Sequence, residues 1–521
     1  MKKALSILIC VVLILTALAG CSKSNAPAGG NGKDSGESTG GANEGRTDLV
    51  FGITSEPKSL TPYQMDEFTG FGISYQLYNA LIELKADGSM VPSLATSWEY
   101  ENDGKDIVFH LREGVKFHDG TEMTAEDVAW SFNRAMETPT TSNTTSTFEK
   151  MEIIDDYTVR LVQKHVFGPV ESVMPFAHLR IVSKAADEAD PDGFGRAPIG
   201  TGPYKFVSWD AGDKITLEAF DDYWEGEPAI KKLVYKISLD TNTALVALEN
   251  GEIDICDTIP NSQKETVDGS DKLVWAAAPQ AATYFLQLNT SNKPFDNKLV
   301  RQAIAHAIDK EALVIGALEG NGAPIEAMMS PSVDFYPEGF KSEFQYNPER
   351  AKELLAEAGY PDGFKVEFTA MDDSRFLPAC EMIQEMLRQI GIDAYIEKYE
   401  RSVWLEKVRN THDYDMTFMN TSPVYSDADY LFSLYHSDFI ATMKNWGEVN
   451  DPELDKLLEE GRATVDEAER AEIYRKVVEV MDKNMYAPPL YVPDQPIVYN
   501  KDLKGVIPNG LRRLFVFDYS W

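Results

Sequence analysis

The fold can be predicted outward from the stretch FHLREGVKFHDGT, residues 109–121, because the sequence in and around it indicates its local structure. Large apolar side chains recur at every second position, at Ile107, Phe109 and Leu111, which is the pattern of a β-strand. Beyond it, Thr124 lies three residues before Asp127, and this spacing resembles the capping box that begins a helix. We therefore predict a strand, a turn and a helix, in that order.

Further strands are predicted on both sides of this stretch. Residues 48–53 are typical of a first strand, and residues 151–163 are typical of a hairpin that turns at 155–156. In the second half of the chain, strands at 392–399 and 415–420 alternate with helices. This alternation predicts an α/β fold.

In the second half of the chain, the sequence indicates where two helices begin and end. Asn347 and Asp451 each precede a proline, and this places an N-cap residue before a proline of the first helical turn. Gly359 and Gly461 follow at helical distance, and we predict that each glycine ends its helix.

Composition limits the functions that are possible. The chain has 521 residues, 43% of them hydrophobic, and a formal net charge of −35. This length exceeds that of one compact core, so we expect two or three lobes. The charge argues against nucleic acid as a partner, because counterion release needs clustered Lys and Arg. It also opposes electrostatic binding to anionic lipid, so membrane contact requires a hydrophobic anchor.

The N-terminus has the form of such an anchor. Residues 1–20 read as a secretion signal, with Lys2 and Lys3 ahead of an apolar run. The run ends in Leu-Ala-Gly-Cys21, which resembles the bacterial lipobox. The cysteine of that motif is lipidated. The alternative is a signal anchor that is not cleaved. Residues 21–46 lack large apolar side chains and are predicted to be a flexible, lipidated tether. We expect an extracytoplasmic protein, anchored by lipid to the cell membrane at its periplasmic face or outer surface.

Signatures of catalysis and of cofactor binding are missing from the sequence. A G-x-S-x-G match at 36–40 lies in the tether rather than between a strand and a helix. There is no P-loop and no H-E-x-x-H, and the seven histidines have no metal-binding spacing. We therefore expect no enzymatic activity, no cofactor and no metal site. Cys256 and Cys380 are expected in different lobes, which argues against a disulfide between them.

Several blocks of sequence, in order along nearly the whole mature chain, carry a resemblance. They are PSLATSW at 92–98, the stretch at 109–121, GTGPY at 200–204, ALENGEID at 247–254, VRQAIAHAID at 300–309 and the region from YNPE at 346–349 to Tyr360. Together they resemble the extracytoplasmic solute-binding proteins of peptide-type ABC transporters, the dipeptide-, oligopeptide- and nickel-binding family 5.

This resemblance implies a two-lobed α/β fold of the periplasmic-binding-protein type, in the large peptide-binding form. Lobe I would comprise residues 47–280 and 487–521, and lobe II residues 281–486. The chain would cross between the lobes twice, at a hinge. Ligand would bind in the cleft between the lobes and be buried when they close.

The loop at 421–430 leaves the end of a strand, where open α/β sheets bind ligands. In short-peptide binders of the family, an Asp of this loop binds the peptide amine, but here that position falls near Pro423 or Val424. Asp427 resembles a structural acid found a few residues later. Dipeptide specificity is therefore left open. The predicted ligand-binding residues of this region are Asn420, Thr421, Ser422, Tyr425 and Asp427.

Other candidates lie elsewhere in the chain. A peptide carboxylate favours an Arg fork, and Arg375 is a candidate for that role, with a solvated surface Arg as the alternative. Flat aromatic side chains give contact area at low entropic cost, although core packing is their ordinary role. On this ground we include Tyr63, Phe68 and Trp404 in the predicted ligand site, and Met65, which lies between Tyr63 and Phe68 in the same loop, is included with them.

The resemblance implies a receptor for transport. We expect a lipid-anchored, monomeric binding protein that captures a small solute, foremost a short peptide, and delivers it to an ABC permease with its ATPase subunits. Two alternatives stay open. One is the same kind of receptor for a nickel complex, glutathione, an opine or an oligosaccharide, and the other is an extracytoplasmic peptide sensor.

Overall fold

A computed structural model describes residues 45–237, 240–423, 425–440 and 444–521. The predicted signal peptide at 1–20, the predicted lipidation site Cys21 and all but the last two residues of the predicted tether lie outside the described residues. Among the residues that are described, no helix combines the length and the apolar character that a membrane span requires.

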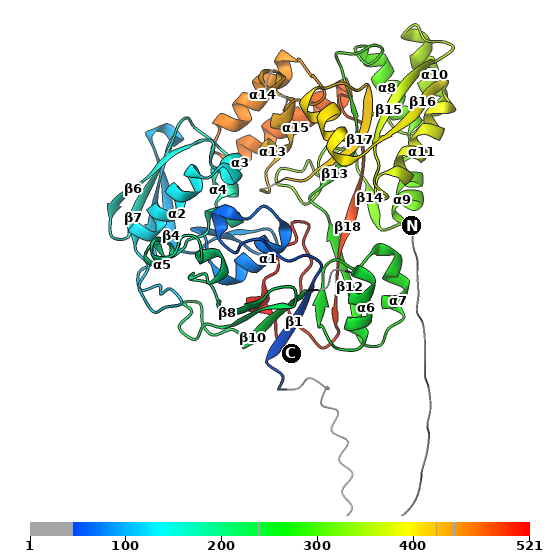
Figure 1. Cartoon of the computed structure of the whole chain (residues 1–521). Coiled ribbons are helices and arrows are strands. Elements are labelled where there is room, and N and C mark those ends of the chain that lie inside the picture. Colours follow the sequence, from blue (N-terminus) through cyan, green and yellow to red (C-terminus); the bar gives the residue numbers. More distant parts are fainter. Residues whose placement is uncertain (1–44, 238–239, 424, 441–443) are drawn as a thin grey trace, which may run out of the picture. The chain divides into compact units, whose positions relative to one another are not determined.

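A sheet of twelve strands runs through the structure (Figure 1). In one half the strands are β8 (Tyr204–Asp210), β9 (Lys214–Ala219), β10 (Lys232–Ile237), β1 (Asp48–Ile53) and β11 (Ile255–Cys256). In the other half they are β13 (Thr283–Leu288), β17 (Met416–Thr421), β15 (Phe364–Met371) and β16 (Ile392–Tyr399). The strands predicted at 48–53 and 392–399 are confirmed, and the one predicted at 415–420 is displaced by one residue. We use lobe I and lobe II for these two halves with the elements that pack on them.

Strand β18 (Pro489–Asn500) belongs to both halves. Its first residues pair with β13 and with β14 (Gly322–Pro324) in lobe II, and its later residues pair with β11 and with β12 (Leu273–Pro279) in lobe I. Pro493 pairs with β14, whereas Asp494 pairs with β12. We propose that the chain crosses between the lobes within β18 and at residues 280–282. This pairing supports the division into lobes that the resemblance implies.

Lobe I contains a second sheet of four strands, β4 (Ala95–Glu101), β5 (Asp106–Leu111), β7 (Thr158–Gln163) and β6 (Phe148–Asp155). The predicted strand at 107–111 and the predicted hairpin are confirmed. Helix α2 (Ala125–Glu137) also begins as predicted, because the Thr124 amide donates to Asp127 Oδ2 over 3.0 Å in a capping box. The other elements are α1 (Phe68–Leu77), β2 (Ile82–Leu84), β3 (Met90–Pro92), α3 (Ser142–Thr145), α4 (Val170–Val173), α5 (Lys184–Ala189), α6 (Thr241–Glu249) and α7 (Lys264–Asp268).

The helices of lobe II are α8 (Lys298–Ala307), α9 (Lys310–Leu318), α10 (Pro348–Glu357), α11 (Leu377–Arg388), α12 (Arg401–Leu405), α13 (Ala428–Phe432), α14 (Pro452–Ala463) and α15 (Glu467–Asn484). The ends predicted for α10 are confirmed: Asn347 caps its first turn, and Gly359 follows it with φ +94°. The end predicted for α14 is wrong. Gly461 lies inside the helix, where a Cβ atom would come within 2.9 Å of the Tyr474 ring of α15. Close helix packing, rather than a turn, requires this glycine.

Three apolar clusters form the interior of the part of the chain that the structure describes. The largest is in lobe II and includes Leu286, Phe368, Ile383 and Phe418, whereas the second is in lobe I and includes Leu49, Phe109, Phe132 and Leu217. A small third cluster surrounds Cys256. Cys256 and Cys380 lie in different clusters as free thiols, and burial raises their pKa values to about 11 and about 12. Both thiols are therefore protonated at neutral pH.

Arg46 ties the start of the described chain to lobe I. The sequence predicts that this residue belongs to the tether. In the structure, however, its Nη1 and Nη2 donate to the two carboxylate oxygens of Asp254, each over 2.7 Å. Its guanidinium also lies 4.4 Å from the ring centroid of Trp521, the last residue. The Asp254 side chain is only 1% exposed, and burial raises its pKa even though Arg46 opposes this shift.

We expect Arg46→Ala to lower the free energy of unfolding by about 2 kcal/mol, because it leaves the buried Asp254 carboxylate without its cation. Urea denaturation of the purified full chain measures this loss. Arg388→Ala is the matched control, because Arg388 forms an exposed ion pair with Glu385 on one helix face, and such pairs contribute about 0.5 kcal/mol or less. Equal effects of the two substitutions would contradict the proposed anchoring.

Candidate functional site

A cavity of about 800 Å³ lies between lobe I and lobe II. Lobe I contributes α3 and the residues that follow it to Thr147, together with His165 and Phe167. Lobe II contributes the end of β17, the loop and helix beyond it, and side chains from three further segments. The volume lies within the range of roughly 300–1,000 Å³ that small-ligand sites occupy. Hydroxyl groups line it from both lobes, at Ser142, Thr144, Ser146, Thr147, Thr421, Ser422 and Ser433.

Four residues of the predicted ligand site border this cavity. Asn420 and Thr421 are the last residues of β17, Ser422 follows the strand, and Tyr425 lies in the next turn. The Tyr425 ring packs edge-on against Tyr430 at a centroid distance of 5.2 Å, and it also belongs to the apolar cluster of lobe I. The loop that sequence reasoning selected therefore reaches from one lobe to the other and forms a wall of the cavity.

Tyr63 and Met65 lie in the interior of lobe I rather than among the residues that line the cavity. The Tyr63 hydroxyl donates to Asp187, and its ring is 2% exposed. The Met65 side chain is fully buried, and its carbonyl lies 3.0 Å from His178 Nε2. These contacts hold the loop after β1 against the lobe.

Phe68, Arg375 and Trp404 also lie outside the cavity lining. Phe68 is 58% exposed, and the Arg512 guanidinium lies 5.4 Å from its ring centroid. Arg375 pairs with Asp373 over 2.6 Å on the surface. Trp404 is buried in lobe II, where its Nε1 donates to Thr417 Oγ1 over 3.1 Å.

Asp427 stands behind the loop and is fully buried. Its two oxygens accept from Nη1 and Nη2 of Arg470, each over 2.8 Å, and Oδ1 also caps α13 by accepting from the Asp429 amide. Ser172 of lobe I donates to Oδ2 over 3.3 Å. Donors from three segments of the chain thus bind the Asp427 carboxylate. These contacts indicate that Asp427 positions the loop.

Asp334 lies beside this ion pair, in the loop after β14. Ser426 donates to Asp334 Oδ1 over 3.0 Å. Burial raises the pKa of Asp334 to about 7, and the nearby negative charge of Asp427 adds to the shift, while Ser426 and Arg470 oppose it. The Asp334 carboxyl is therefore protonated in the folded protein at pH values at which it ionises in the unfolded chain.

Sequence reasoning missed the charged residues of the cavity, which are Arg409, Asp429, Lys444 and Arg462. They come from separate segments of lobe II that only the tertiary structure brings together. The signal available was slight: Asp429 lies two residues beyond Asp427, and Arg409 lies in the helical region after Trp404. Arg462 pairs with Asp429 over 3.2 Å.

Arg409 lies on a π-helical turn, Glu406–Asn410, that continues α12. The Thr411 amide donates to the Glu406 carbonyl over 2.9 Å, and this five-residue step changes the direction of the side chains that follow. The Arg409 guanidinium stacks on Trp446 with 4.3 Å between its carbon and the ring centroid. Its Nε is buried and has no hydrogen-bond partner in the described part of the chain.

A backbone contact joins the two lobes at the edge of the cavity. The Gly168 amide of lobe I donates to the Arg462 carbonyl of lobe II over 2.7 Å. A Cβ atom on Gly168 would lie 1.9 Å from the Thr464 carbonyl oxygen, so only glycine permits this approach. The lobes are therefore in direct contact at α14 and at the 425–427 loop.

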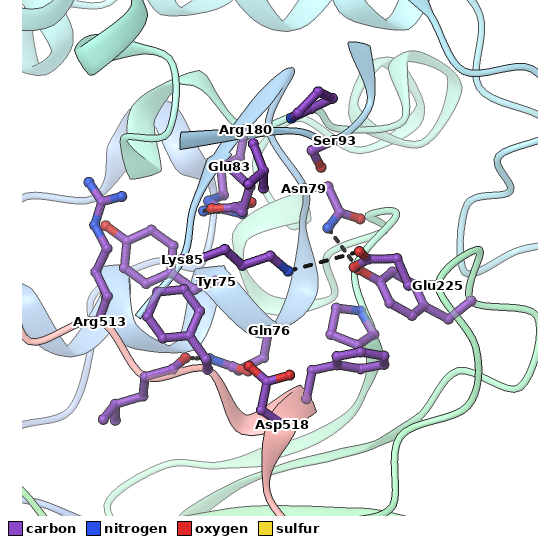
Figure 2. A pocket seen from close by; sticks show the side chains of 17 residues that line it. Tyr75, Gln76, Asn79, Glu83, Lys85, Ser93, Arg180, Glu225, Arg513 and Asp518 are labelled. Carbon is purple, nitrogen blue, oxygen red and sulfur yellow. Dashed lines mark hydrogen bonds and ion pairs between the residues drawn. The ribbon is translucent and has the colours of Figure 1, made fainter. Parts of the chain in front are cut away.

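A smaller cavity, of about 50 Å³, lies in lobe I, and Figure 2 shows the side chains that line it. Lys85 reaches towards Glu225 at 3.9 Å, and Arg180 pairs with Glu83 at 2.5 Å. A volume of this size holds about two water molecules. We therefore assign no solute to it and take the larger cavity as the candidate site.

In the described part of the chain, no three His, Cys, Asp or Glu side chains are grouped closely enough to hold a metal ion. The larger cavity thus presents hydroxyl, amide, aromatic and cationic groups. Such groups can bind and orient a polar solute.

The family model of bacterial extracellular solute-binding proteins, family 5, matches residues 89–442. The chain belongs to this family. It is an extracytoplasmic binding protein of an ABC transporter, with the two-lobed fold that the resemblance predicted. Members of the family deliver small solutes to an ABC permease and are not enzymes.

Three relatives illustrate the range of this family. The glutathione-binding protein GsiB of Escherichia coli K12 is 28% identical over 88% of this chain and 91% of the relative. DppA from Helicobacter pylori, in complex with the peptide STSA, is 27% identical, with a TM-score of 0.74 over 91% of this chain and 97% of that one. AgaA from A. tumefaciens R10, in complex with agropinic acid, is 31% identical, with a TM-score of 0.71 over 90% and 96%.

In this family 5 protein, we expect Asp334→Asn to change how stability depends on pH. The folded-state pKa of Asp334 is raised to about 7, so the contribution of this group to wild-type stability is greatest at low pH and is lost as the pH rises through that value. Asparagine stays neutral, so the free energy of unfolding of the variant relative to wild type should rise by about 2 kcal/mol between pH 5 and pH 8. Urea denaturation at both pH values, with the exposed Asp393→Asn as control, measures this change. A constant difference between Asp334→Asn and wild type would contradict the prediction.

Proposed function

We propose that this chain is a lipid-anchored receptor that captures a short peptide, or a solute of similar size and polarity, in the cavity between its lobes. The cavity itself carries the proposal, because its volume and its hydroxyl, amide and guanidinium groups suit a polar solute of a few residues. Closure of the lobes over the solute would create the form that the permease and its ATPase subunits accept. We further propose that the receptor acts as a monomer.

Relatives support this range of ligands. The DppA complex contains a four-residue peptide, and GsiB is a glutathione-binding protein. The AgaA complex, with agropinic acid, supports a second candidate, a receptor for a non-peptide acid. The cavity contains several cationic side chains, and its carboxylate, Asp429, is already paired with Arg462. It therefore suits the carboxylate of a peptide as well as that of a non-peptide acid.

The anchor is part of the proposal and rests on the N-terminal sequence. Cys21 follows Leu-Ala-Gly, and the residues between Cys21 and Arg46 would be long enough to let the lobes reach a membrane-embedded permease. Each acyl CH₂ buried in a membrane contributes about 0.8 kcal/mol, so more than one acyl chain would hold the protein firmly.

We expect the full chain to bind short peptides and to gain thermal stability from them, by about 2.7 kcal/mol at a free concentration of 100 Kd. Ser422→Trp should abolish this gain, because Ser422 is exposed at the wall of the cavity and an indole would fill the space. Ser262→Trp is the control, because Ser262 is exposed outside the cavity lining. A thermal-shift screen, followed by titration calorimetry, measures both.

Mass spectrometry of ligand that co-purifies with the protein would identify the natural solute. If peptides gave no shift while a nickel chelate or a sugar did, the peptide assignment would be wrong and the receptor function would stand. If deletion of the gene removed a peptide response but left peptide uptake intact, the sensor alternative would be supported.

We expect Cys21→Ser to abolish incorporation of labelled palmitate and to move the protein from the membrane fraction to the soluble extracytoplasmic fraction. The reason is that serine has no thiol to acylate, and the acidic chain lacks other affinity for anionic lipid. Fractionation and labelling of cells expressing either form measure this. Membrane retention of the variant would instead support an uncleaved signal anchor.

A further inference from the structure

The larger cavity is cationic although the chain as a whole is acidic. Among its described lining residues, Arg409, Lys444 and Arg462 carry positive charge and Asp429 carries negative charge, a balance of 3 − 1 = +2 without His165. The whole chain has a formal net charge of −35. A local excess of cations in such a chain attracts negatively charged solutes from solution.

Part of this charge is neutralised by the protein itself. Asp429 Oδ1 accepts from Arg462 Nε and from the Tyr474 hydroxyl, each over 3.2 Å. Arg462 and Asp429 therefore offset each other. The excess charge is carried by Arg409 and Lys444, and neither forms an ion pair with a described carboxylate.

Arg409 is the more informative of the two, because it is partly buried. Burial lowers its pKa, and the positive charge of Arg401 lowers it further, while Tyr430 opposes the shift. Its guanidinium faces the Trp446 ring, and its buried Nε has no partner among the described residues. A buried cation without an anion is costly, so a site of this kind is completed when a ligand brings the anion.

The chain holds Arg409 in this position by its local structure. The π-helical turn at Glu406–Asn410 directs the side chain, and the Tyr414 hydroxyl, which donates to the Trp446 carbonyl, fixes the segment that carries the stacking ring. A guanidinium whose orientation is fixed in advance binds a carboxylate through two parallel hydrogen bonds with little loss of entropy.

We infer that the solute is net anionic, and that one of its carboxylates pairs with Arg409 while Lys444 attracts further negative charge. This inference rests on the proposed function and names its ligand class: a peptide with an acidic side chain, or another small molecule with more carboxylates than amines. Basic peptides and cationic chelates are disfavoured, because Asp429 is the one carboxylate among the described lining residues and is already paired.

The test is titration calorimetry of the full chain, in detergent, with Ala-Glu-Ala, Ala-Ala-Ala, Ala-Lys-Ala, C-terminally amidated Ala-Glu-Ala and agropinic acid. We expect affinity to fall from the glutamate peptide to the alanine peptide to the lysine peptide, and to fall again on amidation. Arg409→Gln should weaken binding of acidic solutes at least tenfold, the range of a charge-assisted pair. Arg409→Lys, which keeps the charge but loses the fork, should be intermediate, and the surface variant Arg388→Gln should bind as wild type does.

The melting temperature without ligand separates a binding role from a structural one. Arg409→Gln removes a partly buried charge that no described carboxylate pairs, so the variant should melt at or above the wild-type temperature while it loses affinity. A variant that melted lower and bound acidic solutes normally once folded would overturn the inference. Equal affinity for acidic and basic peptides would also overturn it and leave the receptor function intact. Binding of no solute in this panel would overturn the inference together with the peptide assignment, and a receptor for a nickel complex or an oligosaccharide would stand.

Discussion

Strand β18 is the constraint on which the rest of the structure depends, because its hydrogen bonds belong to both lobes. It pairs with β13 and β14 over its first residues and with β11 and β12 over its later ones. The lobes are thus built on one continuous sheet, and we propose that they move relative to each other where the strand changes partners. Pro493 and Pro496 lie in this part of β18 and donate no backbone hydrogen bond, which reduces the number of ladder bonds that resist bending there.

The wall of the cavity depends on a second, buried interaction. The Asp427–Arg470 ion pair fixes the loop after β17 from behind, and Ser172 connects the same carboxylate to lobe I. With the loop held in this way, Asn420, Thr421, Ser422 and Tyr425 border the cavity. An ion pair in this position determines which side chains the loop presents, rather than adding greatly to stability, because the cost of desolvating both charges offsets most of their attraction.

Charge distribution connects the location of the protein with its ligand. The acidic charge of the chain opposes electrostatic binding to anionic lipid, whereas the cationic cavity would favour the anionic solute that we propose. The two charge patterns can coexist because Asp429 is buried and paired with Arg462, while the Arg409 guanidinium is partly buried against Trp446.

The sequence by itself determined the family, the α/β class, the strands at 48–53 and 392–399, the capping box at Thr124 and the loop that forms one wall of the cavity. These features depend on local periodicity or on residues close in sequence, so a linear pattern is enough to reveal them. The tertiary structure decided the rest. It placed Tyr63, Met65 and Trp404 in the interior, moved Arg375 to a surface ion pair, put Gly461 inside a helix and docked Arg46 on Asp254. It also brought Arg409, Lys444 and Arg462 together around one cavity. The physical reason is that burial and most of this charge pairing depend on neighbours more than ten residues away, which the sequence around each side chain does not contain. The pair of Arg375 with Asp373, two residues apart, is the exception.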